Sequence, residues 1–334
     1  MTDLARAIAK VLADDDDGGA PSAQLANAAA ELSARYRTGA PTRLQSEREV
    51  DAYLATRLPA TTAAVGRIMR EVRDAWPGLQ PQRQLDLGAG PGAAAWAAAA
   101  VWPGPTEVVL VDRDERMIDA GKALAGAADG VPFGHWQWRH ADIVTGMPRT
   151  EPADLVTATY VLGELEPEAA RTVAAAAWDL TKGCLILAEP GTPAGFERIR
   201  SLRDQLLGLG AHLVAPCPHE GPCPVQGTDW CHFAVRVNRS ATHRRLKGGE
   251  LSFEDEKVSY VAFARPAGIG RAAGRVLRHP TRRRRFVELT VCVGDEITRV
   301  PLGQSHPAYR AAGKLHWGDA VPGEVLGHPG PPTT

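Results

Sequence analysis

The chain has 334 residues, of which 44% are hydrophobic, so it is long enough to bury a substantial core. Its longest apolar run, residues 93–102, falls well short of the roughly 18 residues that a membrane span requires, and its first residues lack the apolar core of a secretory signal, so we expect a cytoplasmic protein with no membrane attachment. The formal net charge is −1, but basic residues are in excess in the last third of the sequence. A nucleic-acid interface in that part of the chain is therefore compatible with the nearly neutral total.

The beginning of the chain is predicted to be helical. Alanine-rich and leucine-containing stretches at helical spacing run from about residue 20 to residue 77, with no convincing alternating strand among them. We therefore assign residues 1–78 to a helical N-terminal subdomain.

Short apolar runs separated by helical segments follow in residues 79–210. This alternation is typical of parallel strands joined by crossover helices. The predicted strands are 84–87, 107–111, 136–139, 154–159 and 184–188. The pattern predicts an α/β core built on a parallel sheet.

The rhythm changes after Leu206, where a stretch rich in Pro, Gly, Cys and His begins. We interpret residues 211–250 as an insertion that a bound group organises. Two more strand-like runs, 257–264 and 286–293, are expected to complete the sheet as its sixth and seventh strands within residues 251–320. Residues 321–334 have few large apolar side chains, so we expect a disordered tail.

A glycine-rich loop follows the first predicted strand. Glycines there allow a sharp turn and leave room for a ligand to approach the backbone. The candidate cofactor-binding residues of this loop are Asp86, Gly88, Ala89, Gly90 and Gly92.

Two further carboxylates follow the next strands. Asp112 is placed to accept hydrogen bonds from ribose hydroxyls, and Asp142 to cap an adenine amine. The spacing alone also satisfies the dinucleotide pattern, so NAD remains an alternative. We favour S-adenosylmethionine because Asp86 stands where a dinucleotide loop usually has an apolar residue, and it can reach the amino group of a methionine moiety. The core is therefore predicted to have the Rossmann-like fold of S-adenosylmethionine-dependent methyltransferases.

Catalytic residues are not evident from the sequence. The fourth strand is not followed by the Asn-Pro-Pro-aromatic motif that handles exocyclic base amines, and the polar side chains there are Tyr160 and Glu164. Glu189, after the fifth strand, is a third weak candidate. Packing and helix-capping roles are about equally compatible with Tyr160 and Glu164, so whether the chain is an enzyme stays open.

Three cysteines lie within fifteen residues, and a fourth follows sixty residues later. Cys217, Cys223, Cys231 and Cys292 could close round an iron–sulfur cluster or a zinc ion. Their irregular, proline-rich spacing favours a cluster, whereas His219 and His232 keep a mixed zinc site open. Cys184 lies in an apolar strand and is interpreted as a core residue.

Two stretches of the last third, 233–249 and 265–286, are basic and free of acidic residues. Such density suits phosphate contacts on structured RNA. The candidate RNA-binding residues are Arg244, Arg245, Lys247, Arg278, Arg282, Arg283, Arg284 and Arg285.

Several segments together resemble a known family, the methyltransferase-like assembly factors of the mitochondrial small ribosomal subunit and their bacterial relatives. The resemblance covers about residues 30–320, and the cysteine spacing is its most specific element. The matching segments are YLATRLPAT at 53–61, DLGAGPG at 86–92, VLGEL at 161–165, CPH at 217–219, CP at 223–224, WCHF at 230–233, Cys292, SHPAYR at 305–310 and WGD at 317–319.

The resemblance implies a four-iron, four-sulfur (4Fe–4S) cluster on the four cysteines, S-adenosylmethionine binding, and association with small-subunit (16S-type) ribosomal RNA. A short Gly/Pro-rich tail departs from the family pattern, and the lack of an organelle-targeting sequence suggests a bacterial member. Two alternatives remain: an active rRNA methyltransferase, and a small-molecule methyltransferase with a structural zinc. A monomer is the default expectation for the oligomeric state.

Overall fold

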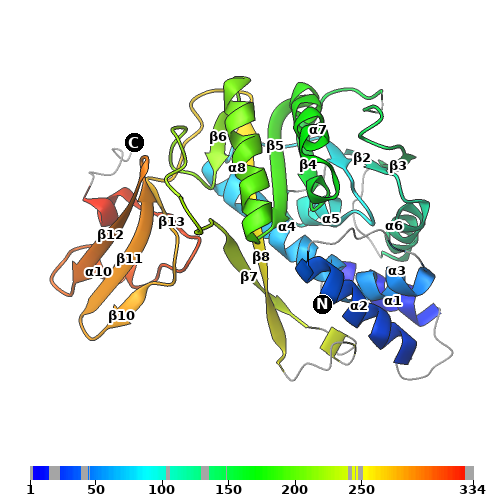
Figure 1. Ribbon diagram of the computed structural model, residues 1–334, viewed down its shortest axis with the longest axis horizontal. Helices are drawn as coiled ribbons and strands as arrows, with labels where there is room; N and C mark the ends of the chain where they lie inside the picture. Colours follow the sequence, from blue (N-terminus) through cyan, green and yellow to red (C-terminus); the bar gives the residue numbers. More distant parts are fainter. Residues whose placement is uncertain are drawn as a thin grey trace. The chain divides into compact units, whose positions relative to one another are not determined.

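The computed structural model describes residues 3–14, 23–38, 44, 46–102, 106–128, 135–147, 149–239, 243–244, 246 and 251–327. The chain divides into two compact units. Their helices and strands are labelled in Figure 1. The first comprises Met1–Arg70, Gln80–Lys182 and Val235–Glu256, and the second comprises Glu71–Leu79, Gly183–Ala234 and Lys257–Thr334. In the described part of the chain, no helix combines the length and the apolar character that crossing a membrane would need.

Helices fill the described residues that precede the first strand, as the helical spacing predicted. They are α1 (Asp3–Asp14), α2 (Ala23–Thr38), α3 (Glu47–Thr56) and α4 (Leu58–Ala75). Ser46 starts α3, because its side chain accepts a hydrogen bond from the Glu49 backbone N–H. Apolar side chains at helical spacing, such as Leu4 and Ile8 of α1, pack against Leu54 in one hydrophobic cluster.

Four parallel strands form the centre of the first unit, in the order β3-β2-β1-β4. These are β1 (Arg83–Leu87), β2 (Glu107–Asp112), β3 (His135–His140) and β4 (Ala153–Thr159), with helices α5 (Ala93–Val101), α6 (Glu115–Ala127) and α7 (Pro167–Asp179). The chain moves outward from β1 to β3 and then returns to the other side of β1 with β4. This reversal is the place where α/β proteins bind ligands, at the carboxyl ends of the strands. All four strands were predicted within two residues.

The second unit contains antiparallel strands in the order β5-β8-β6. They are β5 (Thr181–Pro190), β6 (His212–Ala215) and β8 (Phe253–Ala264), accompanied by helix α8 (Pro193–Gly208). Strand β7 (Phe233–Asn238) also pairs with β8, and residues 235–238 of β7 and 253–256 of β8 belong to the first unit. The predicted strand at 257–264 is thus confirmed as part of β8. Strands β6 and β7, at either end of the cysteine-rich segment, were not predicted.

The second unit also holds a separate five-stranded sheet, which corrects one prediction. The run 286–293 is a strand, β11, but it is not the seventh strand of the core sheet, since it pairs with β9, β10 and β12. The strands are β9 (Gly274–Val276), β10 (Thr281–Arg283), β11 (Phe286–Val293), β12 (Glu296–Gly303) and β13 (Ala320–Val321). Short hairpin connections favour these local pairings, and the alternate residues Val287, Leu289 and Val291 build a hydrophobic cluster of their own.

The expected disordered tail is also partly wrong. Val321 in β13 and Val325 in a 3-10 turn, η2 (Gly323–Leu326), are buried in the cluster of the second sheet, together with Ala312 of α10 (Tyr309–Ala312). Two valines are therefore enough to fix residues 321–327, although the composition around them is rich in Pro and Gly. Residues 328–334 lie outside the described residues.

Candidate functional site

A pocket in the first unit lies where β1, β2, β3 and β4 end at their carboxyl termini. The predicted residues Gly88, Ala89, Gly90, Asp112 and Asp142 line it. The other lining residues come from the loops that follow the four strands and from the N-terminal helical region: Leu44, Tyr53, Thr61, Ala93, Arg113, Asp114, Met117, His140, Ala141, Ile143, Thr159, Tyr160, Val161, Glu164 and Leu165. Asp86 and Gly92 are not part of this lining.

The glycines shape the loop for two reasons. Gly88, Gly90 and Gly92 all have positive φ, at 66°, 53° and 91°, where other residues are strained. A Cβ at Gly88 would in addition lie 2.2 Å from Val161 Cγ2, so the loop and the segment after β4 approach each other closely only because Gly88 has no side chain. Gly92 is the N-cap of α5.

Asp86 is a buried carboxylate with one unsatisfied oxygen. Its side chain is at the end of β1, its residue is 1% exposed, and Oδ1 accepts a hydrogen bond of 2.7 Å from Thr157 Oγ1. Oδ2 is buried with no hydrogen-bond partner among the described residues. Burial raises the pKa of Asp86 to about 7, the bond from Thr157 opposes this shift, and the nearby charge of Asp112 adds to it.

Asp112 is held at the end of β2 by two backbone donors. Its Oδ2 accepts from the Gly90 N–H at 2.7 Å, and its Oδ1 accepts from the Asp114 N–H at 2.8 Å. Burial raises its pKa, while these hydrogen bonds lower it. Asp142 accepts from the Val144 N–H at 2.9 Å in the turn after β3. Both carboxylates therefore have fixed orientations, and a carboxylate can accept further hydrogen bonds.

The three catalytic candidates do not lie in one site. Tyr160 and Glu164 line the pocket, and Glu164 forms an ion pair of 3.2 Å with Arg113. Glu189 lies in the second unit, where it is 1% exposed and pairs with Arg198 at 2.8 Å. Glu189 is thus a structurally paired residue of β5.

Sequence reasoning missed an ion pair that supports Tyr160. Arg57 donates two hydrogen bonds, of 3.2 and 3.0 Å, to the carboxylate of Glu256 on β8, and Tyr160 Oη donates to the same carboxylate at 3.4 Å. Tyr160 has a φ of 59°, an uncommon conformation for a bulky residue. The only sequence signal was Arg57 within the segment 53–61; Glu256 gave none. The hydrogen bond to Glu256, whose carboxylate Arg57 holds, fixes the Tyr160 side chain at the pocket.

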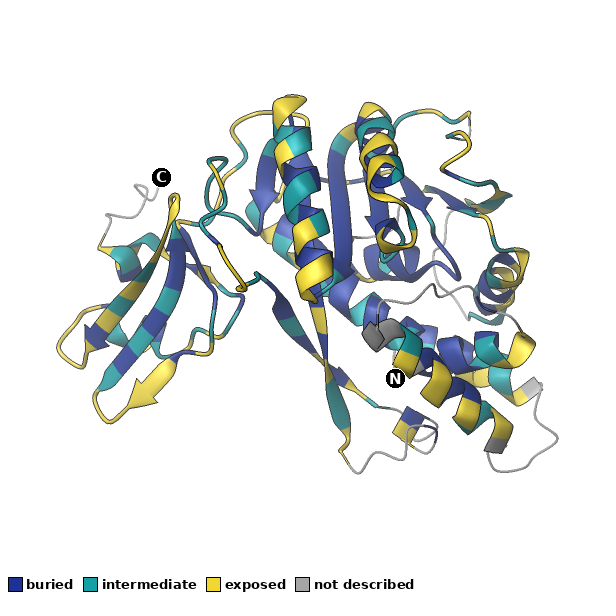
Figure 2. Ribbon diagram, viewed as in Figure 1, coloured by how far each residue is buried: buried dark blue, intermediate teal, exposed yellow. Residues whose placement is uncertain are grey.

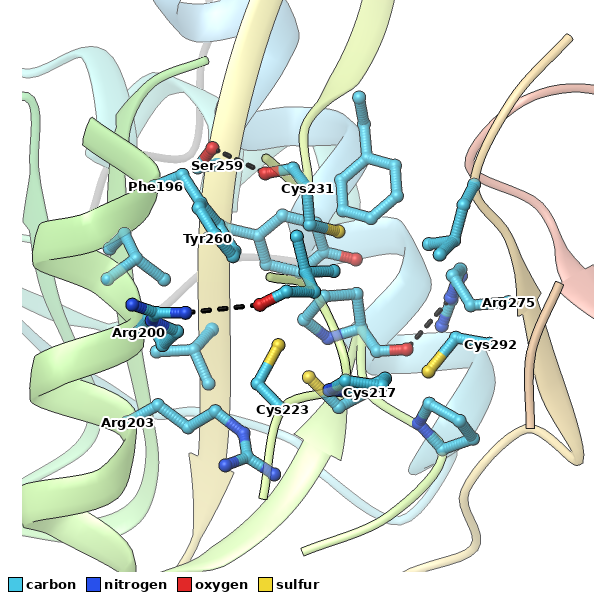
Figure 3. Close-up of a pocket in the computed structure, with 18 of the residues that line it drawn as sticks. Phe196, Arg200, Arg203, Cys217, Cys223, Cys231, Ser259, Tyr260, Arg275 and Cys292 are labelled. Carbon is cyan, nitrogen blue, oxygen red and sulfur yellow. Dashed lines mark hydrogen bonds between the residues drawn. The ribbon is translucent and has the colours of Figure 1, made fainter. Parts of the chain in front are cut away.

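A second pocket, in the second unit, brings the four cysteines together (Figure 3). Cys217, Cys223 and Cys231 come from the connection between β6 and β7, and Cys292 comes from β11. Seventy-five residues separate the first and last of these cysteines in the sequence, so it is the tertiary structure that brings Cys292 of β11 to the same pocket as the other three. Cys184 is buried in β5 and is not part of the lining, as its interpretation as a core residue requires.

The cysteine-bearing connection is tied down by side chains that donate to its carbonyls. Arg203 of α8 donates to His219 O at 3.0 Å and to Gly221 O at 2.7 Å. Arg200 donates to Val225 O at 3.1 Å, and Ser259 to Cys231 O at 2.8 Å, as Figure 3 shows for Ser259. Because the segment has little regular secondary structure, these bonds replace a hydrogen-bonded ladder.

A buried arginine also lines the cysteine pocket. Arg275 is 4% exposed, donates to Pro216 O at 2.8 Å, and forms an ion pair with Glu71. Tyr260 donates to the other oxygen of Glu71 at 2.7 Å. The positive charges of Arg203 and Arg275 face the cysteines and favour their thiolate forms.

Burial and neighbouring cysteines disfavour the thiolate forms of Cys217, Cys231 and Cys292. Burial raises the pKa of Cys217, raises that of Cys292 to about 12, and raises that of Cys231 well above its usual value, and the neighbouring cysteines add to the rise. Arg203 and Arg275 oppose it at Cys217 and Cys292. Iron and zinc bind cysteine as the thiolate, so binding of either would release the protons of these thiols.

Among the described residues, no three Cys, His, Asp or Glu side chains form a group that could hold one ion. His219 lines the pocket, with Nε2 3.8 Å from Cys292 Sγ, whereas His232 stacks on Trp230 with ring centroids 5.1 Å apart.

The basic residues are less uniform than the sequence suggested. Arg236 and Arg239, in a stretch without acidic neighbours in sequence, pair with Asp255 and Glu254. Acidic residues of β8 thus compensate basic residues of this stretch, although the stretch itself contains none. Arg278 likewise pairs with Asp229.

The run Arg282 to Arg285 differs from these pairs. Arg282 donates to Leu315 O at 2.6 Å, while Arg283, Arg284 and Arg285 are exposed and form no ion pair with any residue that the structure describes. Arg244 is exposed, and Arg245 and Lys247 lie outside the described residues.

The parallel order β3-β2-β1-β4, the glycine loop after β1 and the pocket at the strand ends define a Rossmann-like α/β protein of the methyltransferase type. The chain belongs to the Rsm22 family, described as mitochondrial small ribosomal subunit Rsm22, whose model matches residues 47–322.

Among its relatives, the human mitochondrial ribosome assembly protein METTL17 is 31% identical over 289 residues, which is 81% of this chain and 62% of that protein. The Rsm22-cox11 tandem protein 2 of Schizosaccharomyces pombe, also mitochondrial, is 24% identical over 84% of this chain and 44% of its own length. The chain thus spans about half to three fifths of these relatives. A magnesium protoporphyrin IX methyltransferase from Synechocystis is 14% identical, with a TM-score of 0.41 over 70% of this chain and 93% of that one.

Proposed function

We propose that this protein is an RNA-binding assembly factor of the small ribosomal subunit that binds S-adenosylmethionine in the first-unit pocket and a 4Fe–4S cluster on the four cysteines. The observation that carries the proposal is that residues 47–322, matched by the Rsm22 family, include both the glycine-loop pocket and all four convergent cysteines. The name of the human relative adds the role in ribosome assembly.

The first pocket fits S-adenosylmethionine in its charge and shape. Asp112 would accept hydrogen bonds from the ribose hydroxyls, and Asp142 would accept one from the adenine amine. Asp86 has a buried, unpartnered Oδ2 that suits the cationic amino group, although Asp86 is set back from the lining. When bound, this cofactor supplies an electrophilic methyl group; the chain's own residues position and shield it.

The second pocket fits a cluster in its donor set. Four thiols share one lining, and two arginines beside them offset the negative charge that four thiolates and bridging sulfides bring. A 4Fe–4S cluster takes one thiolate on each iron, so it does not need three sulfurs to converge on a single atom. Zinc would need that convergence, since its thiolates all lie about 2.3 Å from one ion. A cluster would join the β6–β7 connection to β11.

Whether methyl transfer occurs is decided by experiment. Purified protein, labelled S-adenosylmethionine and small-subunit particles are combined in a single turnover, and sedimentation of the protein with the particles is measured in parallel. We expect cosedimentation without label in the RNA, because Glu164 is paired and Tyr160 is held by Glu256. Label in the RNA would identify an active rRNA methyltransferase, and failure to sediment with the particles would reject the assembly role.

The affinity for S-adenosylmethionine is expected to fall as the pH falls below about 7. The pKa of Asp86 is raised to about 7, so its carboxyl is ionised above this pH and protonated below it, and a cationic amino group favours the ionised form. The loss should approach tenfold per pH unit below the pKa. Isothermal titration between pH 5.5 and 7.5 measures it, and Asp86→Asn should bind weakly at every pH. An affinity of the unaltered protein that stays constant over this range would rule out the role of Asp86.

A further inference from the structure

The outer face of the second sheet is uncovered along β12 and at the Phe286 end of β11, whereas Cys292, near the other end of β11, is buried in the cysteine pocket. Alternate residues of β11 and β12 point to opposite faces, and the inner face is buried under α10 and η2 by Val287, Leu289, Val291 and Leu302. On the outer face of β12 the alternate residues Ile297, Arg299, Pro301 and Gly303 are all exposed. In Figure 2, β10 is exposed throughout, and more and less buried residues alternate along β11 and β12. The uncovered part of the outer face is therefore available to a partner.

The uncovered face combines one aromatic ring with arginines. Phe286, half-buried at the start of β11, pairs directly with Arg283 on one side and with Gly303 on the other. Glycine leaves that flank of the ring without a neighbouring side chain. Arg299 lies opposite Thr290 on the same face, four residues along from Phe286, which corresponds to roughly 13 Å.

The charge of this face is mainly positive. Arg283 and Arg299 are exposed and form no ion pair with the described residues. The nearest carboxylate on the face is Glu288, which is half-buried between Thr281 and Pro301. Phosphate groups would complement these arginines, whereas an acidic protein segment would provide nothing for the aromatic ring.

The turn beside Phe286 contains an uncommon residue for its conformation. Arg285 has a φ of 62°, where hairpin turns favour Gly or Asn. An arginine in this region costs about 1 kcal/mol or more, and such strain is concentrated at functional positions. The strained residue adds an exposed charge next to the aromatic ring.

We propose that this face, formed by Arg283, Arg285, Phe286 and Arg299, binds single-stranded RNA, with an unstacked base on Phe286 and the phosphates on the arginines. The inference rests on the proposed RNA-binding function and deepens it. Bases of a duplex are stacked and inaccessible, whereas every base of a single strand offers a π-face to an aromatic side chain. The ring of Phe286 and Arg299 are roughly 13 Å apart along the sheet, so the backbone of one RNA strand can pass both.

The test measures binding of a labelled, unstructured 15-nucleotide RNA and of a hairpin duplex to the full-length, metal-loaded protein. Phe286→Leu keeps an apolar side chain but removes the π-face, and we expect roughly tenfold weaker binding of the single strand with little change for the duplex. Phe286→Trp should restore it. Arg283→Gln should lower the slope of log affinity against log salt by about 0.7.

Two controls separate these effects from general damage. Arg236→Gln removes an arginine that is already paired with Asp255, and should leave the salt slope unchanged. Arg285→Gly relieves the positive-φ strain, so it should keep or raise the melting temperature while it weakens RNA binding. A loss of affinity with preserved stability cannot be explained by misfolding.

Unchanged single-strand affinity in Phe286→Leu and Arg283→Gln, in protein that still sediments with small-subunit particles, would overturn this inference and leave the proposed function standing. Failure of the unaltered protein to bind either RNA or particles would overturn both. If a poly-glutamate peptide binds in a Phe286-dependent way and the RNA does not, the face belongs to an acidic protein partner and the inference is wrong.

Discussion

Cys231→Ser is expected to abolish binding of the iron–sulfur cluster. Cys231 shares one pocket lining with Cys217, Cys223 and Cys292, and the charges of these three cysteines contribute to the rise in its pKa. Serine lacks the thiolate that iron requires, and three ligands leave one iron open. The measurements are iron and acid-labile sulfide content and visible absorbance after anaerobic purification, and all three should fall to background.

The same variant should also lose stability. The β6–β7 connection has little regular structure, and without the cluster it is held mainly by the arginine and serine hydrogen bonds to its carbonyls. Binding energies of structural metals are folding energies, so a loss of several kcal/mol is expected in the free energy of unfolding. RNA binding should weaken as well, because β11 carries Cys292 near one end and Phe286 at the other.

The matched control is Cys184→Ala. Cys184 is completely buried in β5, outside the cysteine pocket, so its replacement should cost packing energy but no iron or sulfide. Unaltered protein that is colourless, carries zinc and has no acid-labile sulfide would contradict the cluster. Full iron and sulfide in Cys231→Ser would contradict the assigned ligands.

Gly88→Ala is expected to be the most damaging substitution in the cofactor pocket. The new Cβ would lie 2.2 Å from Val161 Cγ2, at a φ of 66° that an L-residue tolerates poorly. The conformational cost of about 1–2 kcal/mol adds to a steric cost of about 1–3 kcal/mol. Together these should weaken S-adenosylmethionine binding by at least about tenfold, measured by isothermal titration, and lower the melting temperature.

Gly126→Ala provides the control for the same chemical change. Gly126 lies in α6 with nothing within 4 Å of the added Cβ, and alanine is the better helix former. This variant should therefore bind the cofactor normally and be slightly more stable. Normal binding by Gly88→Ala would mean that the loop does not contact the ligand.

The local pattern of the sequence identified the elements around the first pocket. Alternating apolar runs located β1 to β5, and the glycines between β1 and α5 located the turn, because strand and turn preferences depend on neighbouring residues. Asp112 and Asp142 could be placed at the strand ends by counting alone. The four cysteines were recognised as a group from their rarity and spacing.

The tertiary structure alone decided which segments become partners. The run 286–293 was correctly recognised as a strand, but its pairing with β9, β10 and β12 depends on competing partners that the strand pattern does not encode. The same holds for Arg236 and Arg239, whose charges are compensated by β8, and for Arg57, whose partner Glu256 is 199 residues away.

The sequence by itself determined the α/β class, the position of the glycine loop and the identity of the four cysteines, since these follow from residue type and short-range periodicity. Only the tertiary structure separated exposed arginines from paired ones, left Phe286 on an uncovered face, and gave residues 321–327 an ordered place through Val321 and Val325. The physical reason is that burial and ion pairing are properties of what surrounds a side chain, and those surroundings are assembled from segments far apart in the chain.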